Sequence, residues 1–252
     1  MSNTTDPLGV YTVFSIDTSD SSNTANGCPC FGDFDQVGAD ANGFYISTNE
    51  FPLNSGGPGF NGTVIYAMSK SGLINAAEHG GSLPAVQRYA VPLTSGSLPN
   101  PSVTSDPFAG YHLAPSTVTQ GSSSPDTEYF VESNANLPNN ATASGLEVFE
   151  LLHTQLLATG GTPQLVMTTV NTENYSELPP NAVQKAGPTP FATSQGFSGP
   201  AMLQTDFNAV QEVTYANGLL YAELSTGFSN SSNAGAASVS YTHLTLPTIL
   251  RV

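Results

Sequence analysis

An apolar pattern recurs in this chain after a step of 83 residues. The pairs Ile65-Tyr66 and Leu73-Ile74 match Val148-Phe149 and Leu156-Leu157, and each matched position is shifted by 83. In both copies an apolar run of strand length leads into a short polar or helical turn that carries the second pair. A long period with strands in every copy is typical of stacked or radial β architectures. The repeat therefore restricts the fold more than any single motif does.

Strand-like runs with alternating or continuous apolar character surround both copies. They are Val10–Ile16, Gly43–Thr48, Val64–Met68, Gln87–Leu93, Glu128–Glu132, Leu146–Leu151, Gln164–Val170, Val213–Tyr215 and Leu219–Leu224. Two of them follow Asn-Gly turns, at Asn42-Gly43 and Asn217-Gly218, which supply the positive φ that tight hairpins need. The chain is therefore predicted to be all-β.

The spacing predicts a β-propeller-like fold with about three four-stranded blades, at roughly 8–80, 81–160 and 161–238, in one partial domain over residues 1–238. Propellers contain about 4 to 8 blades, so three would form an incomplete ring. The alternative is a β-sandwich with long loops, which would not explain the 83-residue step.

The charge balance excludes one large class of partner. Four Lys and Arg stand against 19 Asp and Glu, which gives a net charge of −15 in 252 residues. A protein that binds nucleic acid by neutralising phosphates needs many more cations. No apolar run approaches the roughly 18 residues of a membrane span, so neither nucleic acid nor a membrane span is expected.

Two cysteines, Cys28 and Cys30, form a Cys-Pro-Cys motif and are the only ones in the chain. Residues two apart in a turn can reach the Cα separation of a disulfide, and a tight disulfide is the favoured interpretation. Two reduced thiols remain the alternative; a zinc site lacks the further ligands it requires. Together with an acidic surface rich in Ser, Thr and Asn, the cysteines favour a secreted protein, although residues 1–7 show no signal peptide.

Several segments resemble a family of secreted bacterial β-propeller-like proteins with no assigned activity. They are Asp6–Gly9, Asp33–Phe51, Phe60–Ala67 and Asn208–Ala222, and the resemblance spans most of residues 1–238. It implies an extracellular location and a propeller-like repeat, and it brings no catalytic residues. The family's opening motif usually follows further sequence, and together with the changed character of the C-terminal residues this predicts a chain truncated at both ends.

The character of the chain changes near Val239. The string Tyr241–Thr248 resembles the translated sequencing-adapter tails found at the ends of broken metagenomic genes. Residues 239–252 are therefore predicted to be a non-native tail, with a genuine final β-strand as the alternative.

Asp33, Asp35, Asp40 and Asn42 lie within ten residues of one another. Their oxygens suit a hard cation, so Ca²⁺ is a possible ligand of this group. Val37 and Phe44 occupy two positions where an EF-hand loop needs oxygen ligands. The alternative is that these side chains satisfy backbone N–H groups of local turns.

Loops rich in Gly, Pro, Ser and Asn are the expected ligand-binding regions of such a fold. The candidate ligand-binding residues are Asp35, Asn49, Glu50, Phe60 and Asp206. The predicted function is an extracellular module that binds a carbohydrate, peptide or cell-surface ligand through these loops. The alternative is a glycan-active hydrolase with paired carboxylates, for which Glu132 and Glu173 are further candidates. The sequence assigns neither catalytic residues nor an oligomeric state.

Overall fold

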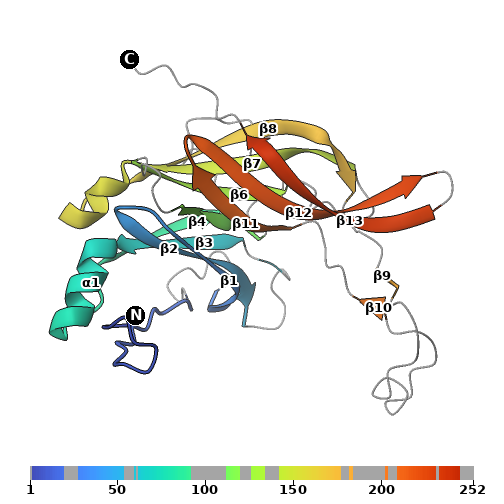
Figure 1. Cartoon of the computed structure of the whole chain (residues 1–252). Helices are drawn as coiled ribbons and strands as arrows, with labels where there is room; N and C mark the ends of the chain where they lie inside the picture. The colour runs from blue at the N-terminus through green and yellow to red at the C-terminus, as the bar shows by residue number, and fades with distance from the viewer. Residues whose placement is uncertain are drawn as a thin grey trace, which may run out of the picture.

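The computed structural model describes residues 2–19, 28–53, 60, 62–91, 112–119, 126–133, 142–176, 182–183, 202–203, 209–230 and 233–244. Most of these residues lie in β-strands, as the sequence predicts (Figure 1). Within these ranges, no helix has the length and apolarity that crossing a membrane requires.

The first sheet is an antiparallel meander with one helix between its last two strands. Its elements are β1 (Cys30–Ala39), β2 (Gly43–Pro52), β3 (Thr63–Ser69), α1 (Lys70–His79) and β4 (Val86–Val91). The Ser69 side chain caps α1 by accepting a hydrogen bond from the Gly72 N–H. Gly80 ends the helix at φ 68°, a left-handed conformation that glycine adopts without strain.

The second sheet has the same order of elements. It contains β5 (Ala114–Val118), β6 (Thr127–Ser133), β7 (Thr142–Leu152), the 3₁₀ helix η3 (Thr154–Thr159) and β8 (Gln164–Ser176). Ile65 lies on β3 and its match Val148 on β7, while Leu73 and Leu157 are buried from α1 and η3. β4 pairs with β3, and β8 pairs with β7. Each strand therefore belongs to the preceding meander, although the boundaries expected at 81 and 161 would place it in the following unit.

The third sheet is formed by β11 (Val210–Ala216), β12 (Leu219–Asn230) and β13 (Asn233–Leu244), and β9 (Ala182–Val183) with β10 (Met202–Leu203) makes a separate pair. β13 passes position 239, where the tail was predicted to begin, without a break in its pairing to β12.

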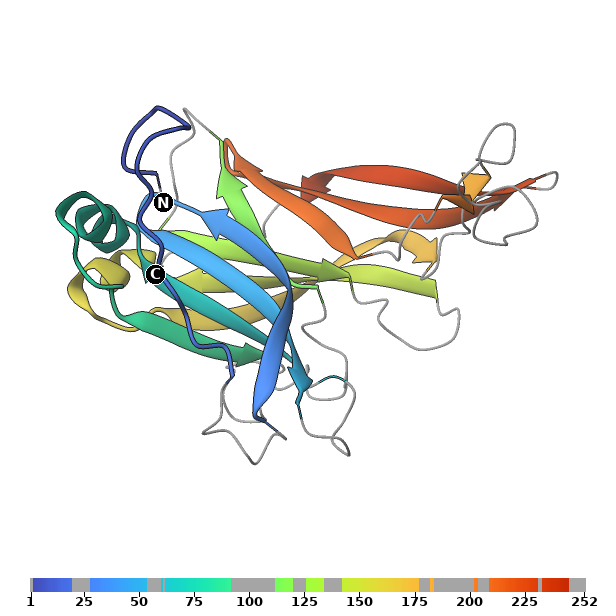
Figure 2. The same cartoon turned by 90° about the horizontal axis from the view of Figure 1, so that it is seen from below.

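Parallel pairing joins the first strands of the three sheets. Ala39 on β1 pairs with Thr117 on β5, and β5 pairs in turn with β11 from Ser116 to Val118. Each antiparallel meander extends from this parallel set, so the three sheets named above are parts of one continuous, branched 11-stranded sheet that is strongly curled (Figures 1 and 2).

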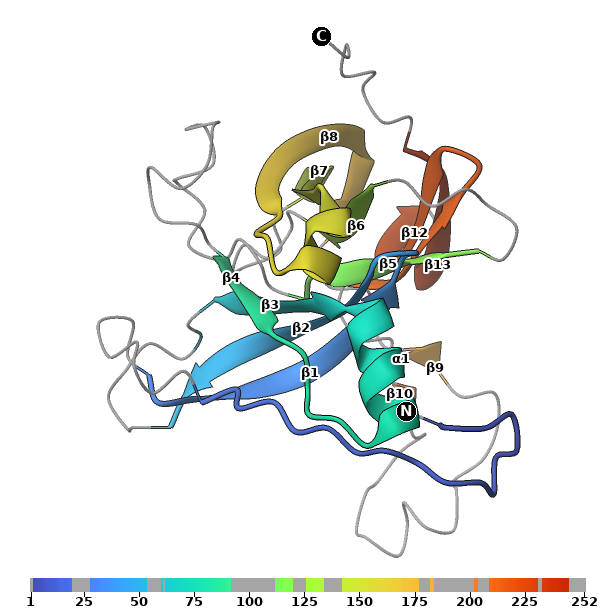
Figure 3. The same ribbon diagram turned by 90° about the vertical axis from the view of Figure 1, so that its left-hand side faces the viewer.

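The first sheet lies in a separate layer from the second and third (Figure 3), and apolar cores fill the space between them. One core, with Tyr45, Ile65 and Phe130 fully buried, lies between the first and second sheets. Another, with Val131 and Leu220, lies between the second and third. A smaller cluster on the outer face of the first sheet packs against Phe14 and neighbouring residues of the N-terminal segment.

The sequence expectations also differ from this fold in the N-terminal segment and in β1. Val10–Ile16 is extended but belongs to no strand, because it lies across the face of the first sheet instead of along its edge. β1 was not predicted as a strand, since its Gly- and Asp-rich sequence is typical of a turn. Pairing with β2 on one side and β5 on the other overrides that local preference.

Candidate functional site

Three phenylalanine rings gather where β1 begins and β2 ends. Phe31 and Phe51 are direct partners in the hairpin, and their ring centroids are 5.5 Å apart in a stacked arrangement. Phe60 follows the hairpin and places its ring 5.9 Å from Phe51. Phe31 is 44% exposed, although burial of such a ring is normally favourable. We call Phe31, Phe51 and Phe60 the aromatic surface.

A bulge in β1 lies beside the aromatic surface. The register shifts between Asp33 and Gln36, and Phe34 in the bulge has a φ of 57°. Its ring lies 3.9 Å from that of His112, which itself has a φ of 58°. Positive φ is costly for such residues and concentrates at functional sites. The Asn49 side chain supports this arrangement by accepting a hydrogen bond from the His112 N–H at 3.1 Å.

Polar side chains complete the surroundings of this end of the hairpin. Asp33 lies opposite Asn49, and Gly32 lies opposite Glu50. Glu50 is 3% exposed and accepts hydrogen bonds from the Thr48 hydroxyl at 2.7 Å and the Tyr66 hydroxyl at 3.3 Å. Burial, and then the Glu50 carboxylate, raise the pKa of Tyr66, so its hydroxyl stays protonated and remains a donor.

Four of the five candidate ligand-binding residues are described, and they lie in the β1–β2 hairpin or just after it without converging on one point: Asn49 and Glu50 are both 3% exposed and face opposite sides of β2. Asn49 and Glu50 lie near the end of β2, Phe60 belongs to the aromatic surface, and Asp35 is exposed in the β1 bulge. Asp206 lies outside the described residues. Phe31, Phe34 and His112 were not predicted.

The four candidate calcium ligands do not converge on one point. Asp33 and Asp35 lie in the bulge, whereas Asp40 and Asn42 lie in the turn at the opposite end of β1. The Asp40 carboxylate accepts hydrogen bonds from the Asn42 and Gly43 N–H groups, which is the turn chemistry considered as the alternative. Among the described residues, no three His, Cys, Asp or Glu side chains form a group suited to a metal ion.

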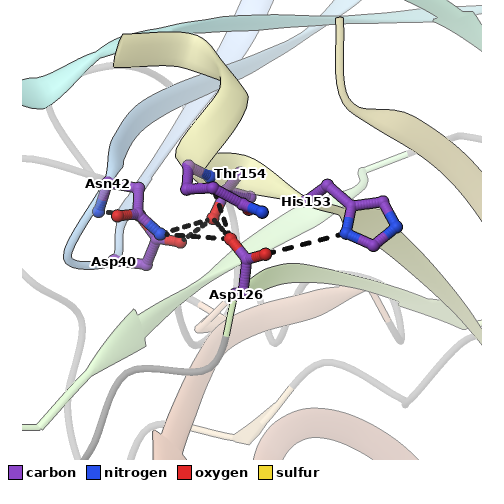
Figure 4. Close-up of polar contacts among 6 residues, drawn as sticks. Asp40, Asn42, Asp126, His153 and Thr154 are labelled. Atoms are coloured by element: carbon purple, nitrogen blue, oxygen red, sulfur yellow. Dashed lines mark hydrogen bonds and ion pairs between the residues drawn. The ribbon is translucent and has the colours of Figure 1, made fainter. Parts of the chain in front are cut away.

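A second polar cluster, here called the polar junction, connects the first two sheets; it contains Asp40, Asn42, Asp126, His153 and Thr154 (Figure 4). The Asn42 side-chain amide donates to the Thr154 hydroxyl at 2.9 Å, and that hydroxyl donates to Asp40 Oδ2 at 2.8 Å. Thr154 is fully buried, so these bonds fix its position between the sheets.

The exposed part of the polar junction is an Asp–His pair. Asp126 Oδ1 accepts a hydrogen bond from the Gln155 N–H at 2.9 Å, and Oδ2 lies 3.7 Å from His153 Nδ1. An Asp–His pair can act as a general base toward a hydroxyl group or a water molecule within hydrogen-bond reach. The nearest hydroxyl, that of Thr154, is buried and already donates to Asp40. Among the described residues, the polar junction therefore holds two sheets together, and the Thr154 hydroxyl is not available to the Asp126–His153 pair as a nucleophile.

Buried glutamates line the space between the first and second sheets. Glu128 is completely buried, and burial first and the Asp40 carboxylate second raise its pKa well above the ordinary value. Its Oε1 accepts a hydrogen bond from the Ser116 hydroxyl, and its Oε2 has no partner. Glu132, a candidate for hydrolysis, lies directly opposite Glu147. Because both are buried, this carboxylate pair faces the protein interior and not a substrate.

The sequence analysis selected no histidine as a site residue. His112 and His153 each acquire a partner from a distant segment, Phe34 and Asp126 respectively.

Cys28 and Cys30 form a disulfide, with Cα atoms 4.5 Å apart, immediately before the aromatic surface. The Leu53 N–H donates to the Pro29 carbonyl at 2.8 Å and ties this short ring to the end of β2. The disulfide thus restrains the end of the hairpin that precedes Phe31 and follows Phe51. A comparison of the chain with family models, curated proteins and solved structures found no match.

Proposed function

We propose that this protein is a secreted, propeller-like module that binds a carbohydrate on the aromatic surface. The observation that carries the proposal is the row of three phenylalanine rings, of which Phe31 is 44% exposed beside a disulfide-restrained hairpin. Aromatic rings present a flat apolar face, and sugar rings present matching C–H faces. A rigid platform also loses little conformational entropy on binding.

Polar groups near the rings supply what a sugar needs besides stacking. Asp33 and Asp35 are exposed, and their carboxylates are strong acceptors for hydroxyl groups. A site that hydrogen-bonds hydroxyls discriminates strongly among ligands that carry or lack them. The combination favours a carbohydrate over an apolar peptide.

The arrangement of the sheets supports the propeller-like part of the proposal. Three antiparallel meanders extend from first strands that run parallel, and apolar cores fill the space between successive sheets. Each meander would be one blade of an incomplete ring. The Cys28–Cys30 disulfide supports the extracellular location, since disulfides persist in oxidising compartments.

A glycan array followed by calorimetry with the best ligand tests the proposal. Phe31→Ala and Phe51→Ala should each weaken binding about tenfold, which corresponds to roughly 1.4 kcal/mol per ring. Leu53→Ala is the matched control, because Leu53 is an apolar residue at the same edge, 59% exposed and outside the aromatic surface. Equal affinity of the Phe51 variant and the Leu53 variant would refute the site. Turnover of the bound glycan would instead support the hydrolase alternative.

A further inference from the structure

The two faces of the first sheet are covered unequally. On the inner face, toward the second sheet, Tyr45 and Ile65 are completely buried. On the outer face, Phe44 and Ile46 in the same strand remain partly exposed. Large apolar side chains on the face of a sheet are normally buried beneath a second layer of structure. The cover of the outer face therefore leaves space over these residues.

That cover is the N-terminal segment, residues 10–19, which crosses the first sheet on the side away from the second (Figures 2 and 3). It is held at one end by the Thr12 hydroxyl, which donates to the Ala77 carbonyl at 3.2 Å. At the other end the Ser19 carbonyl accepts a hydrogen bond from the Cys30 N–H at 2.8 Å. Between these points Phe14 and Ile16 pack against the sheet.

A cavity of about 420 Å³ lies between this segment and the sheet. Its lining is almost entirely apolar and includes Phe14, Phe44, Ile46, Met68 and Leu83. The volume falls within the range of small-molecule binding sites. A sugar is a poor occupant, because its hydroxyl groups would lose water without gaining hydrogen bonds.

Lys70 is the only charged residue in the described lining of this cavity. One N–H of its ammonium donates to the Asp40 carbonyl at 2.7 Å, and an ammonium has three such donors. Lys70 is also the first residue of α1, so the positive end of the helix dipole adds to its charge. In a chain of net charge −15, this is a local site for an anionic group.

We propose that the cavity binds a single-chain carboxylate amphiphile, such as a medium-chain fatty acid. The alkyl chain lies against Phe44, Ile46 and Met68, and the carboxylate accepts hydrogen bonds from Lys70. The site is separate from the aromatic surface and does not depend on the carbohydrate proposal.

Calorimetric titration of the full chain with dodecanoate and with dodecanol tests the inference. Both ligands should bind once per chain, and dodecanoate should bind more tightly. Lys70→Met keeps the apolar stem and removes the charge, so it should weaken dodecanoate binding about tenfold. Its affinity for dodecanol should be unchanged. An equal effect on the two ligands would overturn the carboxylate assignment.

A pair of surface variants tests the position of the cavity without disturbing folding. Val13 lines the cavity and is 85% exposed, whereas Val10 is 68% exposed on the same segment outside the lining. Val13→Glu should weaken dodecanoate binding at least about fivefold through charge repulsion, and Val10→Glu should leave it unchanged. Equal affinities of these two variants, or no binding at about 1 mM dodecanoate, would overturn the proposal. Phe51→Ala should bind dodecanoate normally, which separates this result from failure of the carbohydrate site.

Discussion

Glu128→Gln should stabilise the protein relative to the parent, and this difference in the free energy of unfolding should grow as the pH rises. Glu128 is completely buried between the first and second sheets, and only one of its two carboxylate oxygens has a hydrogen-bond partner. Burial raises its pKa, the negative charge of Asp40 raises it further, and the hydrogen bond from Ser116 acts in the opposite direction. The folded protein therefore holds the proton of Glu128 at pH values where the unfolded chain has released it.

The sign and the size of the effect follow from proton linkage. Below the ordinary value of 4.5 the carboxyl is protonated in both states, and its ionisation does not affect stability. Above that value unfolding releases the proton, so the free energy of unfolding falls by up to about 1.4 kcal/mol per pH unit. The fall continues until the pH passes the raised pKa of the folded state. Glutamine has nearly the same shape and no ionisable proton, so the variant should lose this contribution to the slope.

Urea unfolding at several values from about pH 4 to pH 8 measures the effect, with far-UV circular dichroism as the signal. The free-energy difference between Glu128→Gln and the parent should grow with pH, in favour of the variant. Glu212→Gln, on an exposed position of β11, is the control and should show no such trend. Burial also raises the pKa of Glu150, but that contribution is common to all three proteins and cancels. A pH-independent difference for Glu128→Gln would refute the reasoning.

Three further changes test the polar junction, the helix end and the disulfide in thermal or urea unfolding. Thr154→Ala removes the buried hydroxyl that donates to Asp40 and should lower the free energy of unfolding by about 1–3 kcal/mol. Thr154→Ser keeps the hydroxyl and should retain most of this stability. Equal losses in the two variants would contradict the role of the hydrogen bond. Gly80→Ala should cost about 1 kcal/mol because Gly80 ends α1 at φ 68°, and an unchanged midpoint would argue against this end of the helix. The double change Cys28→Ser with Cys30→Ser should cost less than about 2 kcal/mol, because the disulfide closes a very short loop. A larger loss would mean that the ring also supports the aromatic surface.

Much of the candidate site could be anticipated from the sequence, but its central contacts could not. Asn49, Glu50 and Phe60 were selected because they are polar or aromatic residues at or near a loop, where ligand binding was expected. The contact between the tilted rings of Phe34 and His112 was missed, since positive φ at two non-glycine residues has no local sequence signal. The clustering of four oxygen-bearing residues near β1 suggested one cation site. The strand between them extends and carries them to opposite ends, because successive residues of a strand advance about 3.3 Å each.

The local pattern determined most, but not all, of the elements of this protein. Apolar alternation, Asn-Gly turns and the 83-residue step were sufficient for an all-β chain in which strands precede a short helical turn. Tertiary structure alone decided how the sheets combine: which first strands run parallel, which faces are buried, and that Thr154 bonds to Asp40 across 114 positions. The periodicity of apolar residues that predicts a strand depends only on residues close together in the sequence. Contacts between distant segments depend on closing long loops and on burying whole faces together, and no short stretch of sequence encodes that balance.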